Sequence, residues 1–469
     1  MSKGYEKILF KFKSAWDTIK ENDRELVYDF SKNYKTFLDN GKTERECVKE
    51  IVKLAEKNGF INIEDFLIGR EPIKEGKKIF VNYKGKAAAL LVVGKDLIEK
   101  GMNIVAAHID SPRLDLKPFP LYEEEGLALF KTHYYGGIKK YQWTSLPLAF
   151  HGVVINKQGE KIEIVIGEHE DDPVFYITDL LPHLAKEQHE KKLGEGITGE
   201  GLNVLIGSIP YDMEEKEDRV KCHIMNLLNE KYGFEEDDFI AAEIEVVPAV
   251  KAKDVGFDRS MIGAYGQDDR VCAFAALRAI LEVENPKRTA VGLFVDKEEV
   301  GSVGNTGMYS KFFENMVAEL ISLQSDNYND LMLRRAMAET KVLSADVGAA
   351  FDPNYPDVLD KRNAAFAGKG VIIVKYTGTR GKSSTNDANA EFLNEIRNLF
   401  NANEIQWQIG ELGKVDQGGG GTIAYILANY GAEVVDCGVP VLSMHSPLEI
   451  VSKIDIYMAY KAYKAFMKN

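Results

Sequence analysis

Two adjacent glutamates, Glu298 and Glu299, follow the apolar run at residues 290–295 and stand just before Gly301. A strand that delivers two neighbouring carboxylates into a glycine-containing loop can place one on a metal ion and leave the other free to transfer protons. Adjacent glutamates are also frequent on solvated loops, where they have no chemical role. The pair therefore predicts a hydrolytic site only if other segments of the chain bring suitable partners to it.

A histidine and an aspartate end another apolar segment. Residues 104–107 are wholly apolar, as in a buried central strand, and His108 and Asp110 follow at a spacing of two. Side chains at this spacing share one face of an extended chain. A metal-binding imidazole commonly passes its other N–H to an acceptor, so the spacing suits a ligand with its supporting carboxylate. The alternative is a strand-end histidine that caps a turn.

Three further positions repeat this pattern. Asp268 precedes a helical stretch that begins near Val271, Asp346 follows the strand-like segment 341–345, and His445 follows the last predicted strand region, residues 433–444. Each has a plain interpretation when taken alone, and Asp268 in particular could be a helix N-cap. In open α/β sheets, however, binding sites are built at the edge where strands end, which favours a shared site.

Two imidazoles and three carboxylates form a nitrogen and oxygen ligand set that suits zinc or cobalt. One carboxylate can bridge two ions, and two ions about 3.5 to 4 Å apart can together polarise a carbonyl and activate water. Glu298 is then left without a metal, as general base and later as acid. The predicted ligands are His108, Asp268, Glu299, Asp346 and His445.

The helices and strands that must position these residues follow two sequence patterns, one of mixed helices and strands and one of short strands. Two helices are predicted between residues 14 and 58, and strands at 78–83, 87–93 and 104–107. After residue 254 helices and strands alternate, which predicts an α/β fold with a mixed, mostly parallel sheet flanked by helices. Between about residues 115 and 253 short alternating strands predict an inserted β-rich domain, with one short helix near 180–188 and loops at 190–201. The α/β domain is thus predicted in two parts, residues 1–114 and 254–469.

Bulk composition limits the class of protein. The chain has 469 residues, enough for two domains, with 45% apolar and 28% charged residues and a net charge of -14. No basic stripe is present that could neutralise phosphates, which argues against nucleic acid and anionic membranes as partners. The widely spaced cysteines argue against a disulfide framework, and the N-terminal segment lacks the apolar core of a signal peptide. These features predict a cytoplasmic protein. The cysteines are Cys47, Cys222, Cys272 and Cys437.

Five motifs carry a resemblance to a known family. They are His-Ile-Asp-Ser-Pro-Arg-Leu-Asp (108–115), Gly-Gln-Asp-Asp-Arg-Val-Cys-Ala (266–273), Asp-Lys-Glu-Glu-Val-Gly-Ser (296–302), Ser-Ala-Asp (344–346) and Met-His-Ser-Pro (444–447). Tyr135-Gly136-Gly137-Ile138, Pro182-His183-Leu184, Asp352-Pro353-Asn354-Tyr355-Pro356 and the glycine run 418–421 add to it. In this order, over nearly the whole chain, the motifs resemble the aspartyl aminopeptidase and aminopeptidase I family of dizinc exopeptidases.

The resemblance implies two zinc ions per subunit, with cobalt or manganese as possible substitutes. His108 and Asp346 would hold one ion, Glu299 and His445 the other, and Asp268 would bridge them. Asp110 would orient His108, and Glu298 would be the acid/base. The inserted domain would mediate dimerisation within a tetrahedral homododecamer, where His183 would reach the active site of a neighbouring subunit.

The substrate preference is left open between two branches of the family. Lys375 stands where acid-preferring members carry a lysine that can pair with a substrate carboxylate, which would suit peptides with N-terminal Asp or Glu. Residues 377–382, Thr-Gly-Thr-Arg-Gly-Lys, instead resemble the aminopeptidase I branch, in its bacterial form, which favours neutral and often hydrophobic N-terminal residues. The balance favours a broad or neutral preference.

Three other functions are compatible with parts of the pattern. A dizinc deacylase or carboxypeptidase could use the same ligands on other substrates. A non-catalytic oligomeric shell could keep the fold alone, although the retained Glu298 argues against it. A phosphate-binding role for the glycine run 418–421 is weak, because the run lacks the spacing and the Gly-Lys-Ser/Thr ending of nucleotide loops.

Overall fold

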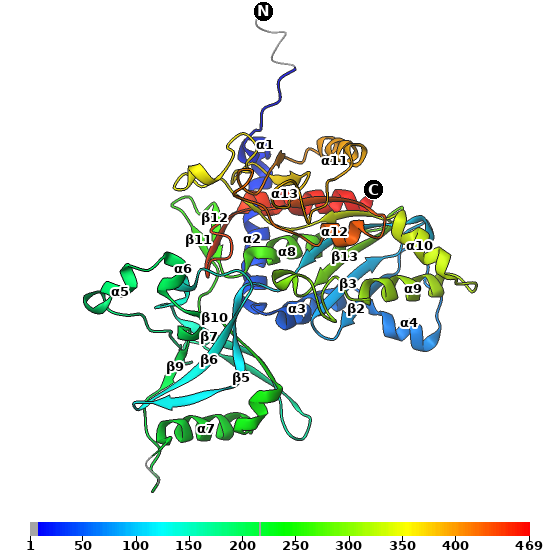
Figure 1. Cartoon of the computed structure of the whole chain (residues 1–469). Coiled ribbons are helices and arrows are strands. Elements are labelled where there is room, and N and C mark those ends of the chain that lie inside the picture. Colours follow the sequence, from blue (N-terminus) through cyan, green and yellow to red (C-terminus); the bar gives the residue numbers. More distant parts are fainter. Residues whose placement is uncertain (1–7, 215–216) are drawn as a thin grey trace, which may run out of the picture.

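A computed structural model describes residues 8–214 and 217–469 of the chain. It contains an α/β body and a β-rich part that projects from it (Figure 1). Residues 1–7, which include the start of the segment that lacks signal-peptide features, lie outside the described residues. None of the helices in the described ranges is long and apolar enough to cross a bilayer.

A nine-stranded mixed sheet forms the centre of the α/β body. Its middle strands run parallel and consist almost wholly of buried residues, which explains their continuous apolar sequences. The strands in spatial order are β1 (Ile61–Asn62), β2 (Lys78–Tyr83), β3 (Ala87–Val92), β13 (Thr289–Val295), β4 (Met102–His108), β14 (Lys341–Ser344), β18 (Glu433–Gly438), β16 (Val371–Val374) and β17 (Trp407–Ile409).

Helices cover both faces of this sheet, and each layer has its own buried core. Most of the covering helices turn an apolar stripe toward the sheet, whereas α8 (Gln267–Leu281) is buried along almost its whole length. One face packs against α2 (Arg24–Asn40), α3 (Glu44–Lys57), α8 (Gln267–Leu281), α11 (Ala390–Ala402) and α13 (Lys453–Lys468). The other packs against α4 (Ile63–Gly69), α9 (Phe312–Gln324), α10 (Asp330–Ala338) and α12 (Ala424–Ala428).

The β-rich part is built on a six-stranded sheet whose described pairings are all antiparallel. Its order is β8 (Lys161–Ile166), β7 (Leu148–Ile155), β10 (Ala242–Pro248), β5 (Arg113–Glu124), β6 (Leu127–Tyr135) and β9 (Val204–Gly207). Helix α7 (Arg219–Tyr232) packs on this sheet, and both contribute to one core. Figure 1 shows α7 on the far side of the sheet from the α/β body.

A third sheet of five short strands lies beside the α/β body. It joins β11 (Lys253–Val255), β12 (Met261–Ala264), β20 (Glu449–Ser452), β19 (Pro440–Leu442) and β15 (Gly348–Ala349). Because β12 leads directly into α8 and β19 is followed by His445, this sheet positions two of the predicted ligands.

The predicted fold class, a mixed α/β fold with helices on the sheet, is confirmed. The opening helices and the buried strand at 104–107 are also where the sequence predicts them. The prediction was wrong for α4 and α7, which it left out, and for residues 190–201, predicted as loop, where α6 (Leu193–Gly196) and the 3-10 turn Gly199–Gly201 form. Between the predicted helix at 309–322 and the strand at 341–345 it also left out α10. The exact domain limits stay a prediction.

Candidate active site

The predicted ligands come together because strands from distant parts of the chain end at one edge of the sheet. Strands β13 and β4 are parallel with Val295 opposite His108, and β14 runs parallel to β4 with Ser344 opposite Ala106. Parallel neighbours present their carboxyl ends at the same edge. The loop after β13 carries Glu298 and Glu299, and the residues after β14 carry Asp346.

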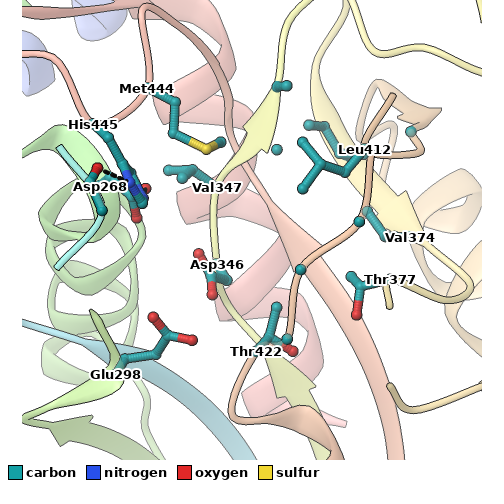
Figure 2. A pocket seen from close by; sticks show the side chains of 18 of the residues that line it. Asp268, Glu298, Asp346, Val347, Val374, Thr377, Leu412, Thr422, Met444 and His445 are labelled. Carbon is teal, nitrogen blue, oxygen red and sulfur yellow. Dashed lines mark hydrogen bonds and ion pairs between the residues drawn. The ribbon is translucent and has the colours of Figure 1, made fainter. Parts of the chain in front are cut away.

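The Asp268 carboxylate lies between the two imidazoles. Its Oδ1 is 3.2 Å from His108 Nε2, and its Oδ2 is 3.3 Å from His445 Nε2. Figure 2 shows Asp268 and His445 on one side of a cavity, with Asp346 and Glu298 facing them. A carboxylate with one oxygen toward each imidazole has the geometry of a bridge between two sites.

The remaining carboxylates divide between the two imidazoles. Asp346 Oδ1 and Glu298 Oε2 each lie 3.9 Å from His108 Nε2, whereas Glu299 Oε2 lies 3.5 Å from His445 Nε2. Two groups of potential ligand atoms each fall within 4.8 Å of one another: His108 with Asp268 and Glu299, and His108 with Glu298 and Asp346. All five predicted ligands and Glu298 are thus brought together.

The tautomer of His108 and of His445 follows from the hydrogen bond that Nδ1, the ring nitrogen away from the carboxylates, makes. His445 Nδ1 is 2.8 Å from the carbonyl oxygen of Gly137, and His108 Nδ1 is 3.0 Å from the carbonyl oxygen of Asp110. A carbonyl oxygen only accepts, so Nδ1 carries the proton in both residues. Each imidazole thus turns Nε2, the nitrogen that a metal would bind, toward the carboxylates. Without a metal, and although burial opposes the shift, hydrogen bonds to Asp110 and Asp268 raise the pKa of His108 well above its ordinary value, and Asp268 and Glu299 raise the pKa of His445 to about 10.

The charge balance of this space fits bound cations. Burial and repulsion from Asp268 raise the pKa of Glu299 well above its ordinary range, and burial, with repulsion from Glu298, raises that of Asp346. Glu299 Oε1 is buried without a hydrogen-bond partner among the described residues. Buried carboxylates are costly unless a positive charge compensates them. The residues present therefore fit a divalent metal site.

The carboxylates of Asp110 and Glu449 accept hydrogen bonds from the backbone of the predicted site residues and so fix their positions. The Asp110 carboxylate accepts hydrogen bonds from the backbone N–H groups of Glu298 and Glu299, both at 3.1 Å, and lies 3.3 Å from His108 Nδ1. The Glu449 carboxylate accepts from the backbone N–H of Asp268 at 3.0 Å and of His445 at 2.7 Å. Glu449 was not predicted from the sequence; the signal for it is a carboxylate four residues after His445.

Glu298 has the acidity of a proton-transfer group. Burial, with repulsion from Asp110 and Asp268, raises the pKa of its carboxyl to about 7, although His108 and His445 oppose the shift. A general base or acid works best when its pKa lies near the working pH. Glu298 is therefore suited both to accept a proton and to return it.

A cavity of about 430 Å³ opens beside these groups. Away from the predicted ligands its wall is largely apolar, and Thr377 and Thr422 are among the polar exceptions (Figure 2). The other polar side chains of this wall are those of Ser302, Glu411 and Tyr425. The glycine run 418–421 forms part of the wall, where the chain passes so close that a Cβ on Gly419 would lie 1.8 Å from the carbonyl oxygen of Gly378. The apolar residues that line the cavity are Val347, Ala349, Ala365, Ile372, Val374, Leu412 and Met444.

The profile of a family described as "Aminopeptidase I zinc metalloprotease (M18)" matches residues 37–467. The chain belongs to this family. A "Probable M18 family aminopeptidase 1" of Clostridium acetobutylicum is 54% identical over 462 residues, which cover 98% of this chain and 99% of the relative.

Solved M18 structures share the whole fold. A crystal structure of an M18 aminopeptidase from Thermotoga maritima has a TM-score of 0.93 at 47% identity and covers 98% of this chain and 100% of its own. Aminopeptidase I from Clostridium acetobutylicum has a TM-score of 0.92 at 52% identity with the same coverage. A structure described as the S. cerevisiae mApe1 dodecamer, at 22% identity, a TM-score of 0.75 and coverage of 94% of this chain and 97% of its own, shares the fold. The chain is thus a zinc metallo-aminopeptidase, as its sequence predicts.

Two residues expected in this M18 site lie outside the cavity lining. The Lys375 side chain is half exposed, and its Nζ lies 3.9 Å from Asp387 Oδ1. It points away from the cavity because Ile372 and Val374 line the cavity and the next residue of an extended chain faces the opposite side. His183 is exposed on the one-turn helix Pro182–Leu184 of the β-rich part. Within one subunit, neither side chain is part of the cluster around Asp268.

Proposed function

We propose that this M18 aminopeptidase hydrolyses the N-terminal peptide bond with two zinc ions and Glu298 as acid/base. The observation that carries the proposal is the placement of Asp268, with one carboxylate oxygen toward the Nε2 atom of each imidazole. His108 and Asp346 would hold one ion, Glu299 and His445 the other, and Asp268 would bridge them. When bound, such ions supply Lewis acidity toward the peptide carbonyl and lower the pKa of water.

The chain's own groups would move the proton. Glu298, with its backbone N–H held by Asp110, would accept the proton of the attacking water and deliver it to the leaving amine. A carboxyl with a pKa of about 7 can take both roles near neutral pH. Asp110 would keep His108 in the Nδ1-protonated form that leaves Nε2 free.

We further propose a preference for neutral, hydrophobic N-terminal residues, because the cavity wall is largely apolar and Lys375 does not line it. Glu411, which does line it, accepts a hydrogen bond from the Tyr376 hydroxyl and would repel an acidic substrate side chain. With leucyl and aspartyl anilides, kcat/KM should be higher for the leucyl substrate by roughly tenfold or more, since a substrate carboxylate would be buried without a partner. N-acetyl-leucyl anilide, measured beside them, should not turn over. Turnover of only the blocked substrate would contradict the aminopeptidase proposal.

The variant Lys375→Ala tests whether Lys375 contributes to the choice of the N-terminal residue. It should leave the leucyl kcat/KM within about twofold, because an exposed ion pair contributes little. An aspartyl preference that disappears in Lys375→Ala would show instead that the lysine binds an acidic side chain.

Assembly into a tetrahedral homododecamer built from dimers is also proposed, with the β-rich part as the dimerisation element. Its support is the family resemblance, the dodecamer described for S. cerevisiae mApe1, and exposed apolar side chains around His183. Leu180, Leu181 and Leu184, next to His183 in the chain, are 45%, 48% and 67% exposed, as expected of side chains that a neighbouring subunit would cover. His183 would then act in the cavity of a neighbouring subunit.

Light scattering should therefore give the mass of a dodecamer. His183→Ala should keep that mass and lower kcat by roughly tenfold or more, through loss of a group that stabilises the reacting carbonyl. A fully active monomer, or a dodecamer in which His183→Ala has unchanged kcat, would contradict this part of the proposal.

A further inference from the structure

The segment Tyr135–Gly137, at the end of β6 in the β-rich part, contacts the predicted metal site at three points. The Tyr135 hydroxyl donates to Asp110 Oδ2 at 2.8 Å, and the Gly137 carbonyl oxygen accepts from His445 Nδ1 at 2.8 Å. A Cβ on Gly136 would lie 3.3 Å from Glu299 Oε2. The Tyr-Gly-Gly motif therefore contacts the predicted ligands beyond the Gly137 carbonyl oxygen that fixes the tautomer of His445.

Asp110 is the group through which Tyr135 can act. Its buried carboxylate receives the N–H groups of Glu298 and Glu299, lies beside His108 Nδ1, and accepts the Tyr135 hydroxyl. Oδ2 is shared between Glu299 N–H and the tyrosine. A displacement of this carboxylate would move a predicted ligand and the predicted acid/base together.

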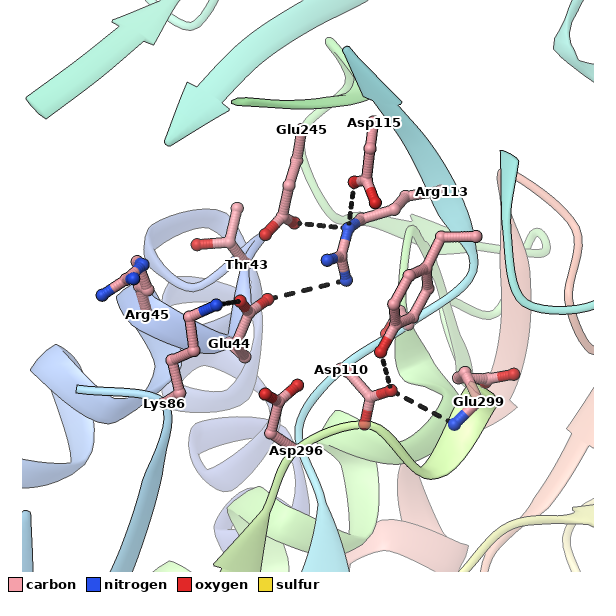
Figure 3. Close-up of polar contacts among 12 residues, drawn as sticks. Thr43, Glu44, Arg45, Lys86, Asp110, Arg113, Asp115, Glu245, Asp296 and Glu299 are labelled. Carbon is pink, nitrogen blue, oxygen red and sulfur yellow. Dashed lines mark hydrogen bonds and ion pairs between the residues drawn. The ribbon is translucent and has the colours of Figure 1, made fainter. Parts of the chain in front are cut away.

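Tyr135 is itself fixed by a buried ionic cluster, shown in Figure 3. The Arg113 guanidinium lies 3.8 Å from the centre of the tyrosine ring, and its Nε is 2.8 Å from Asp115 and 3.1 Å from Glu245. Glu44, on α3 of the α/β body, lies 3.6 Å from Arg113 Nη1. These ion pairs hold the Arg113 guanidinium in place, because breaking a buried ion pair is costly. The guanidinium in turn holds the Tyr135 ring against which it packs.

We infer that Tyr135 is a positioning residue of the metal centre, which holds Asp110 in place through its hydroxyl, so that the β-rich part supports catalysis within its own subunit. The inference rests on the proposed function. Outer hydrogen-bond partners orient metal ligands and influence both metal affinity and activity. The Arg113 cluster makes this support depend on the contact between the two parts of the chain.

Tyr135→Phe tests this inference, because it removes the hydroxyl and keeps the ring beneath Arg113. In the zinc-loaded enzyme, kcat on leucyl anilide should fall about 10- to 100-fold with KM nearly unchanged. Zinc release to a chromogenic chelator should be faster by roughly tenfold or more. The unfolding midpoint of the metal-free protein should drop no further than in the matched control.

The matched control is Tyr463→Phe, which removes a buried hydroxyl that donates to the Cys437 carbonyl oxygen at 2.7 Å in the helical core. It should reproduce the stability change and leave zinc release unchanged. Unaltered kcat and zinc release in Tyr135→Phe, or equal changes in both variants, would overturn the inference. The wild type separates this failure from failure of the proposed function, since a wild type without two bound zinc ions would contradict the latter.

Discussion

Glu298→Gln is expected to lower kcat by about two to four orders of magnitude, the usual contribution of a general acid/base, while the protein keeps its zinc. The amide has nearly the shape of the carboxylate but cannot accept the proton of water. Glu298 lies 3.9 Å from His108 Nε2, whereas Glu299 is the glutamate beside His445. Steady-state kinetics and metal analysis on one sample check the two halves of this expectation.

Glu282→Gln is the control for this variant. Glu282 is a half-buried glutamate at the end of α8 that interacts with Tyr460 and Lys464, outside the cavity. It should retain wild-type kcat and zinc content. A fully active Glu298→Gln enzyme would show that another group transfers the proton, and loss of zinc from it would make Glu298 a ligand.

Asp268→Asn is expected to abolish activity, by roughly three or more orders of magnitude, together with loss of zinc. The neutral amide keeps one oxygen toward one imidazole and turns an NH2 group toward the other. It also removes the charge shared by both sites. Zinc content after dialysis should fall well below that of the wild type.

Asp346→Asn provides the comparison for Asp268→Asn. Asp346 Oδ1 lies 3.9 Å from His108 Nε2, on the proposed site of one ion only, so that site should lose affinity and the other should keep it. The two variants should thus differ in residual zinc, with Asp346→Asn retaining more. Equal, full occupancy in both would contradict the bridging role of Asp268.

Much of the site could be predicted because its residues follow apolar strands. The segment 104–107 and the run 290–295 are buried central strands, so their sequences mark both the element and the edge at which it ends. Parallel pairing of β4 and β13 then brings His108 near the Glu298 loop. The order of the family motifs supplied which carboxylate pairs with which histidine.

Other parts depend on contacts that local sequence does not contain. Glu449 meets the backbone of Asp268 across 181 residues, and Tyr135 reaches Asp110 through a strand of the inserted sheet. The position of Lys375 outside the cavity follows from the alternation of side chains along an extended chain, since its neighbour Val374 lines the cavity. Helix α7 was missed although Val220, Ile224 and Leu228 recur at helical spacing, because the surrounding sequence suggested strands and loops.

A bridging Asp268 requires two zinc ions, one toward each oxygen of its carboxylate. Anomalous scattering at the zinc edge, measured on crystals of the zinc-loaded enzyme, would locate them. We expect two peaks roughly 3.5 to 4 Å apart, one next to His108 and Asp346 and the other next to His445 and Glu299. A single peak in a fully active enzyme, or peaks bound by other residues, would contradict it.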